Sequence, residues 1–249
     1  MDLSDWKQDL RKALLALLAL LMWTLLLGWS GAAVFSRQHK AAAPVSGEAE
    51  YPFVALTFDD GPRYDTTADL LDGLALRGIR ATFFLVGLSV EGNEDLVLRM
   101  EAEGHQIGIH SQNHKVLTEL RGAALYWEVD QLRHTLSDLL GRSNFMVRPP
   151  YGIIDEAVCR GADAPVILWS VDPEDWADRD TARQVEHIVS RVGDGDIILL
   201  HDIYPSSVET ALQVVDRLLA EGFFFVTVEE LFELRGITPQ KGEVYRSLP

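Results

Sequence analysis

His110 and His114 stand four residues apart and form the first pair whose types and spacing suggest chemistry. An i, i+4 spacing places two imidazoles on the same side of a helical turn, where both can bind one metal ion. By itself, such a pair is more often two ordinary polar histidines. A nearby carboxylate would favour a metal site instead, because two imidazoles and one carboxylate leave positions open on a divalent metal for water and substrate. We predict Asp60 as the third ligand.

The Asp59-Asp60 pair, which is followed by Gly61 and Pro62, has two interpretations. Asp, Gly and Pro are turn-forming residues, so the segment could simply lead a strand into a loop. However, two adjacent carboxylates with no cation nearby would repel each other. A metal ion on Asp60 would remove that repulsion and leave Asp59 free to accept a proton from an activated water. The segment therefore predicts metal-dependent hydrolysis, with Asp59 as the general base.

Five apolar segments of the chain run directly into polar residues. Segments 53–58, 106–109, 145–147, 166–171 and 196–200 lead into Asp59-Asp60, His110, Arg148, Asp172 and His201-Asp202, respectively. In a parallel barrel, catalytic groups come from the C-terminal ends of several strands, which lie on one face. We therefore expect these polar side chains, apart from Asp202, to surround one opening together with His114, Asp175 and Trp176, and we expect Asp202 to lie beside that opening.

The elements that must position these residues alternate along the chain. Further strands are expected at 81–86 and 223–227, and helices at 66–77, 95–103, 123–140, 181–192, 207–221 and 229–235. Alternating strands and helices are typical of parallel β/α units. Because so many strands share one domain, the sequence predicts an α/β fold in the form of a (β/α) barrel rather than an open sheet.

The N-terminal part of the chain contains a long uncharged run at 13–35, which favours a transmembrane anchor. These 23 residues would extend about 35 Å as a helix, and the apolar core of a bilayer is about 30 Å thick. A cleaved signal peptide is the alternative, but its apolar region usually has only about 7 to 15 residues. We therefore expect a cytoplasmic segment at 1–12, the anchor at 13–35, a linker at 36–51 and a catalytic domain at 52–249.

The composition excludes nucleic acid as a partner and a disulfide-based scaffold. The formal net charge is -16 at pH 7, whereas a nucleic-acid-binding protein needs a basic surface to offset phosphate charge. Cys159 is the single cysteine, so the chain cannot form an intrachain disulfide. The histidines outside the motifs are predicted to lie at the surface; they are His39, His105, His134 and His187.

Five segments resemble, in chain order, the five motifs of the polysaccharide deacetylase family, the NodB-homology enzymes of carbohydrate esterase family 4. The segments are 57–62 (TFDDGP), 110–114 (HSQNH), 148–152 (RPPYG), 172–176 (DPEDW) and 199–201 (LLH), and 81–87 (ATFFLVG) is similar to the family as well. The resemblance covers residues 53 to about 235. Many members carry Asn where this chain has Ile109; because that Asn is not a ligand, we expect metal binding to be retained.

The resemblance implies the family's distorted (β/α) barrel with seven or eight strands, which the uncharged run at 13–35 would precede as one N-terminal transmembrane helix. It implies that Asp60, His110 and His114 hold a divalent metal, commonly zinc, with cobalt, nickel or manganese as alternatives. Asp59 would be the general base, and Arg148 would pair with it and hold it in place.

The same resemblance implies roles for the acid and for the substrate pocket. His201 would be the general acid, with Asp175 in contact to tune its pKa. Trp176 and Leu199 would form the wall around the acetyl methyl group. Tyr151 lies where a backbone N–H helps to stabilise the oxyanion in the family.

The implied activity is the removal of N-acetyl groups from N-acetylglucosamine-type residues of an extracellular polysaccharide, with peptidoglycan as the first candidate. The motif residues would contact only the acetamide group and the metal. Chitin oligomers, other exported glycans and other small amides or esters are therefore alternative substrates. The alternative from a different class is a glycan-binding protein without activity on the same fold. We expect the N-terminus inside the cell and the catalytic domain outside, held at the cell membrane by one span. Substrate choice is expected to depend on loops that include 87–95 and 152–164.

Overall fold

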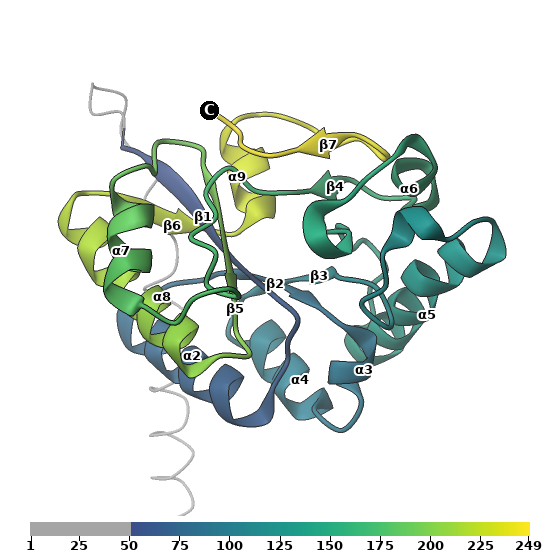
Figure 1. Cartoon of the computed structure of the whole chain (residues 1–249), viewed down its shortest axis with the longest axis horizontal. Helices are drawn as coiled ribbons and strands as arrows, with labels where there is room; N and C mark the ends of the chain where they lie inside the picture. Colours follow the sequence, from purple (N-terminus) through teal and green to yellow (C-terminus); the bar gives the residue numbers. More distant parts are fainter. Residues whose placement is uncertain (1–50) are drawn as a thin grey trace, which may run out of the picture. The chain divides into compact units, whose positions relative to one another are not determined.

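Strands and helices alternate through the part of the chain that the computed structural model describes, residues 51–249 (Figure 1). The strands are β1 (Phe53–Asp59), β2 (Thr82–Leu85), β3 (Gln106–Ile109), β4 (Val166–Ile167), β5 (Ile197–His201), β6 (Phe224–Val226) and β7 (Val244–Tyr245). β3, β2, β1 and β5 lie side by side in that order, all parallel, and β6 pairs with the first half of β1. The predicted parallel β/α organisation is therefore confirmed.

Single parallel bridges continue the sheet beyond its named strands. Val147 bridges Ile109 of β3 on one side and Val166 of β4 on the other. Val171, four residues beyond β4, bridges Ile198 of β5. Because β5 also pairs with β1, these bridges close the parallel strands into a distorted barrel.

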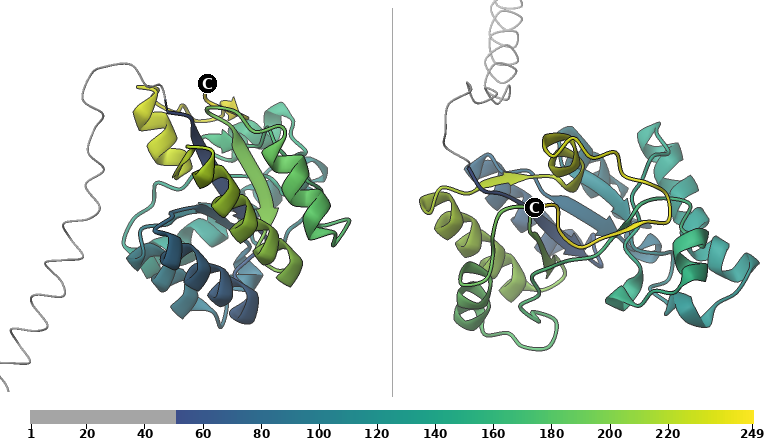
Figure 2. Two further views of the ribbon diagram at one scale, coloured as in Figure 1. Left: turned by 90° about the vertical axis from the view of Figure 1, so that its left-hand side faces the viewer. Right: turned by 90° about the horizontal axis from the view of Figure 1, so that it is seen from above.

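Helices flank the sheet on its outer side, as the two further views show (Figure 2). α2 and α7 both pack against α8, and α4 packs against α5. The helices are α2 (Tyr64–Arg77), α3 (Gly87–Val90), α4 (Glu94–Ala102), α5 (Ala123–Leu140), α6 (Glu156–Gly161), α7 (Thr181–Val189), α8 (Pro205–Ala220) and α9 (Val228–Leu234), with 3₁₀ turns at Leu117–Glu119 and Pro150–Gly152. All six predicted helices are confirmed, with ends that differ by at most three residues.

The alternation of side chains along β1 directs the functional residues into the barrel. Val54, Leu56 and Phe58 belong to the main core cluster, which they share with residues of the flanking helices. Successive residues of a strand point to opposite faces, so the intervening positions face inward. At the C-terminal end of the strand these inward positions are Thr57 and Asp59. The continuous apolar run of β1 thus ends with a carboxylate inside the barrel.

Some elements and one histidine differ from the sequence predictions. The predicted strand at 145–147 is reduced to one bridging residue, Val147, because Pro149 and Pro150 soon follow and lack the N–H that a ladder needs. The strand at 166–171 is regular only at Val166–Ile167, and α3, α6 and β7 were not predicted. The surface prediction for His105 is wrong: its ring is buried, and its Nδ1 accepts the backbone N–H of Ala81.

The N-terminal predictions fall mainly on residues outside the described range. The segment at 1–12, the span at 13–35 and the linker at 36–51, apart from its last residue, lie there. Within residues 51–249, no helix has both the length and the apolar character needed to cross a bilayer.

Candidate active site

Asp59 ends β1 and is held by Arg148, which follows the bridge of Val147. The fully buried guanidinium donates from Nη1 to Asp59 Oδ1 at 2.8 Å and to Thr57 Oγ1 at 2.7 Å. Its Nε and Nη2 donate to the carbonyl oxygens of Ile167 and Leu168. A buried charge is tolerated when it is paired and its donors are satisfied, so this network fixes the guanidinium and, through it, the carboxylate.

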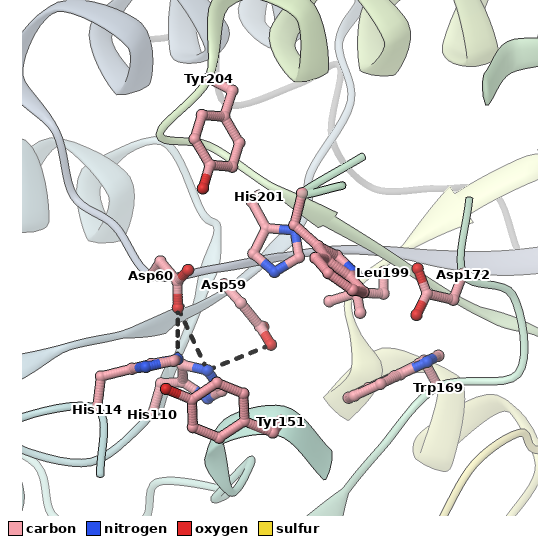
Figure 3. A pocket seen from close by; sticks show the side chains of 11 residues that line it. Asp59, Asp60, His110, His114, Tyr151, Trp169, Asp172, Leu199, His201 and Tyr204 are labelled. Carbon is pink, nitrogen blue, oxygen red and sulfur yellow. Dashed lines mark ion pairs between the residues drawn. The ribbon is translucent and has the colours of Figure 1, made fainter. Parts of the chain in front are cut away.

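Asp60, His110 and His114 bring three potential metal-binding atoms together (Figure 3). Asp60 directly follows β1, and the two histidines lie in the loop after β3. Asp60 Oδ1 is 3.4 Å from His110 Nε2 and 3.0 Å from His114 Nε2. The candidate ligand atoms all lie within 4.8 Å of one another, so one ion can reach all three.

The hydrogen bonds around this cluster fit a divalent cation. His110 Nδ1 lies 2.7 Å from the carbonyl oxygen of Arg148, which can only accept, so this nitrogen carries a proton. In the neutral ring, Nε2 then presents its lone pair toward the Asp60 carboxylate. Asp60 Oδ1 is buried and has no hydrogen-bond donor among residues 51–249. Lone pairs that converge in this way are what a metal such as zinc requires.

The same cluster shifts the pKa of its members. Burial disfavours the charged form of His110, but the Asp59 and Asp60 carboxylates outweigh it and raise the pKa of this imidazole. Burial also disfavours ionised Asp60, yet the two neighbouring imidazoles hold the pKa of that carboxyl well below its usual range. Metal binding opposes this shift, because only the neutral imidazole is a ligand, so metal and protons compete for the ring.

His201 ends β5 and is paired with Asp175, which is fully buried. Its Nδ1 lies 2.7 Å from Asp175 Oδ1, and its backbone N–H donates to Asp175 Oδ2 at 2.9 Å. Burial acts against the charged ring, but the Asp175 carboxylate outweighs it and raises the pKa of His201 to about 9. The imidazole is thus protonated at neutral pH and can donate a proton from Nε2.

A single cleft of about 490 Å³ receives most of the predicted residues (Figure 3). Eight of the ten predicted site residues line it; they are Asp59, Asp60, His110, His114, Tyr151, Trp176, Leu199 and His201. The other two, Arg148 and Asp175, lie buried behind the cleft, where the Arg148 side chain binds Asp59 and the Asp175 side chain binds His201. The structure therefore brings the predicted set together at one opening.

The three residues predicted to contact substrate differ in exposure. Leu199 is buried in β5, whereas Trp176 and Tyr151 are 54% and 58% exposed at the rim. The Tyr151 ring packs edge-on against His114, with ring centroids 4.7 Å apart, so this residue lies beside the metal-binding cluster. A rigid apolar wall and two exposed aromatic rings suit contact with a methyl group and with sugar rings.

Trp169, Asp172 and Tyr204 also line the cleft. Asp172 was expected at the opening as a strand-end residue, although without a chemical role, whereas Trp169 and Tyr204 were not predicted there. Trp169 lies within the apolar segment 166–171, and nothing in that segment distinguishes it from its apolar neighbours. Its ring packs against the backbone at Gly152, where a Cβ atom would overlap it. Tyr204 stands three residues after His201, and the Arg179 guanidinium lies 3.5 Å from the centre of its ring. No pattern in the sequence distinguishes it from other loop tyrosines.

Unusual backbone conformations concentrate in the motifs. Among residues 51–249, six non-glycine residues have positive φ, and Asp163 is the only one outside the motifs. The others are Asp60, Ser111, His114, Tyr151 and Glu174. Such conformations are strained for residues with side chains and persist where surrounding contacts hold them, as at functional sites.

Gly61 lets the turn after β1 approach a buried carboxylate closely. A Cβ atom at this position would overlap the carboxylate of Asp202, which receives a hydrogen bond from the Thr67 hydroxyl. Burial raises the pKa of Asp202 to about 7 despite that hydrogen bond. Asp202, which was expected beside the opening, therefore lies beneath the turn and supports it.

Comparisons with known proteins place this arrangement in a family. The family model described as polysaccharide deacetylase matches residues 46–164. A peptidoglycan-N-acetylglucosamine deacetylase of Bacillus cereus is 34% identical over 73% of this chain and 89% of its own length. The chain belongs to the polysaccharide deacetylase family. The predicted resemblance is thereby confirmed, and with it the α/β fold class.

Two further proteins are similar to this chain. The peptidoglycan-N-acetylmuramic acid deacetylase PdaC of Bacillus subtilis is 37% identical over 73% of this chain, which spans only 39% of that relative's length. The structure of a family 4 acetyl xylan esterase from Clostridium thermocellum, solved with a cobalt ion, has a TM-score of 0.75 and 29% identity. That match covers 79% of this chain and 99% of the esterase.

Proposed function

We propose that this chain is a metal-dependent hydrolase that removes N-acetyl groups from N-acetylglucosamine-type residues of an extracellular polysaccharide, with peptidoglycan as the first candidate. The observation that carries the proposal is the set of three groups in one cleft: a metal-binding cluster, a carboxylate held by Arg148 and an imidazole held by Asp175. Amide hydrolysis needs an activated water, a base to deprotonate it and an acid to protonate the leaving nitrogen. Each requirement has its own group here.

Asp60, His110 and His114 would hold the metal, for which we propose zinc, with cobalt, nickel and manganese as alternatives. Two imidazoles and a carboxylate suit all four ions, so the donor set alone does not select one. When bound, such an ion supplies Lewis acidity, which makes water easier to deprotonate and polarises the acetyl carbonyl group. Elemental analysis of the purified protein would identify the native ion.

Asp59 would act as the general base. Its Oδ1 is bound by Arg148, whereas its Oδ2 faces the metal-binding cluster and lies 3.6 Å from His110 Nε2. Oδ2 is therefore the atom that would accept the proton of the attacking water, whose oxygen forms the new bond to the acetyl carbon. The backbone N–H of Tyr151 would stabilise the oxyanion, a role in which one donor can change the rate by about 10²- to 10³-fold.

His201 would act as the general acid. Because its Nδ1 faces Asp175, Nε2 is the nitrogen available to the cleft. It would deliver its proton to the leaving nitrogen as the carbon–nitrogen bond breaks, which yields acetate and a free amine on the sugar. Leu199 and Trp176 would enclose the acetyl methyl group.

Two arguments support an extracellular glycan as the substrate. The relatives from Bacillus species are named as deacetylases of peptidoglycan. In addition, the uncharged run at 13–35 would anchor the chain in the cell membrane with its N-terminus inside. The linker at 36–51 would then let the domain at 52–249 reach the wall.

Acetate release by the purified chain tests the proposed activity. The chain would be incubated with peptidoglycan, chitin oligomers and acetylated xylan, and acetate would be measured over time. We expect the highest kcat/KM with peptidoglycan. Release from acetylated xylan alone would instead indicate an ester hydrolase, in line with the acetyl xylan esterase of similar structure. A metal-loaded chain that releases no acetate from any of the three would contradict the proposal and favour a binding protein.

The pH dependence of turnover should follow the pair of His201 and Asp175. An acid must be protonated to act, so activity should fall as the pH rises through the His201 pKa of about 9. Asp175→Asn removes the charge that raises this pKa and should move the alkaline limb of kcat/KM down by about 1 to 3 pH units. Glu174→Gln is the control, because Glu174 is the exposed neighbour in the same loop. An alkaline limb that does not move in Asp175→Asn would show that His201 is not the acid.

A further inference from the structure

Glu128 of α5 is a buried carboxylate that none of these steps uses; only 1% of its surface is exposed. Its Oε2 accepts the backbone N–H of Asn113 at 2.8 Å, and its Oε1 accepts Asn113 Nδ2 at 3.1 Å. Oε1 also lies 3.1 Å from Lys115 Nζ. In addition, the carbonyl oxygen of Glu128 accepts the backbone N–H of Gln112 at 2.7 Å. One helical residue thus binds three positions of the loop that carries both metal-binding histidines.

These contacts flank His114 on both sides. Asn113 precedes it and Lys115 follows it. Glu128 binds the backbone N–H directly before His114 and pairs with the exposed Lys115 side chain directly after it. His114 itself has a φ of 55°, a left-handed conformation that residues with side chains rarely adopt. The carboxylate therefore helps to hold a backbone conformation that His114 would not keep in a free loop.

The two histidines differ in what orients their rings. His110 Nδ1 is bonded to the carbonyl oxygen of Arg148, the outer partner that metal-binding histidines almost always have. Within the described residues, the His114 ring has no comparable bond from Nδ1; its backbone N–H donates to Ser111 Oγ, and its ring touches Tyr151. The direction of the His114 imidazole consequently depends on the backbone that carries it.

We propose that Glu128 is a positioning residue for the metal-binding cluster, and that it holds His114 through the loop backbone instead of through the imidazole. This inference rests on the proposed function, because it takes His114 as a metal ligand. It explains why a helix of this domain buries a carboxylate against this loop. The backbone N–H groups of Gly87 and Leu88 already hold the first part of the loop by donating to the carbonyl oxygens of Ser111 and Gln112, whereas Glu128 binds the part next to His114.

The affinity of the full chain for Zn²⁺ tests the proposal. Glu128→Gln keeps the shape of the side chain but turns one acceptor into a donor that faces Asn113 and Lys115. We expect the Zn²⁺ dissociation constant, measured by competition with a chromophoric chelator, to rise by about 10- to 100-fold, as when other outer partners of metal ligands are lost. Asp138→Asn is the matched control, because it removes the same charge from an exposed position of α5. Its dissociation constant should equal that of the wild type.

Two further variants separate positioning from other effects. Glu128→Asp keeps the charge but shortens the side chain, so it should also lose affinity; wild-type binding in this variant would mean that charge alone attracts the ion and would overturn the proposal. Asn113→Ala removes one contact and should weaken Zn²⁺ binding less than Glu128→Gln, and it decides the matter if Glu128→Gln does not fold. Wild-type Zn²⁺ affinity in both Glu128→Gln and Asn113→Ala would overturn the proposal.

The positioning role and the proposed function can fail separately. A wild-type chain that binds Zn²⁺ but releases no acetate would contradict the proposed function, while a loss of Zn²⁺ affinity in Glu128→Gln would still support the positioning role.

Discussion

Replacing Asp59 with Asn is expected to lower kcat/KM for acetate release by about 10²- to 10⁴-fold, the range for loss of a general base. The amide fills the same volume and can still accept a hydrogen bond from Arg148 Nη1, which binds Asp59 Oδ1 at 2.8 Å. It cannot, however, take a proton from water. Metal content should be unchanged, because Asp59 is not one of the three residues in the metal-binding cluster.

The adjacent carboxylate provides the contrast for this experiment. Asp60→Asn alters a residue whose Oδ1 lies 3.0 Å from His114 Nε2, so this variant should lose metal as well as activity. Elemental analysis of both variants, alongside acetate release, separates a missing base from a missing metal. Near wild-type turnover in Asp59→Asn would show that another group accepts the proton.

Removal of one imidazole from the metal-binding cluster should have an effect at least as large. His110→Ala and His114→Ala each leave two of the three ligands, and we expect metal occupancy to fall and acetate release to drop by more than about 100-fold. A chelator should abolish activity in the wild type, and added Zn²⁺ should restore it. Metal content by elemental analysis and acetate release would be measured on the same samples.

His134→Ala is the matched control for these histidine variants. His134 is exposed on α5, and its Nδ1 lies 2.7 Å from the carbonyl oxygen of Asp130 in the same helix. Its loss should change neither metal content nor turnover. Acetate release that persists after chelation, in samples shown to be free of metal, would contradict a metal-dependent mechanism.

The residues at the ends of the strands were predictable because two simple rules determine their place. A short, continuous apolar run predicts a buried strand, and parallel strands present their C-terminal ends on one face. These rules predict the location of four site residues, which are Asp59, Asp60, His110 and His201. The pairing of Asp59 with Arg148 does not, since 89 residues separate them and only the family resemblance indicated it.

The residues that were missed lack a local signal. Glu128 lies in a helix, where a glutamate is normally taken for a solvated residue, and its burial depends on the loop that packs over it. Trp169 lies in an apolar run, and the sequence does not reveal that β4 stops being regular before it. β7 has only two residues, too few for a periodic pattern to appear.

The close approach of Gly61 to Asp202 has a consequence for how this turn can vary. Any side chain at position 61 would collide with the carboxylate beneath it, so no single replacement there is free of conflict. A randomised library at position 61 alone should return only glycine, whereas simultaneous randomisation of position 202 to small residues could recover others. The two positions, far apart along the chain, are expected to change in concert or not at all.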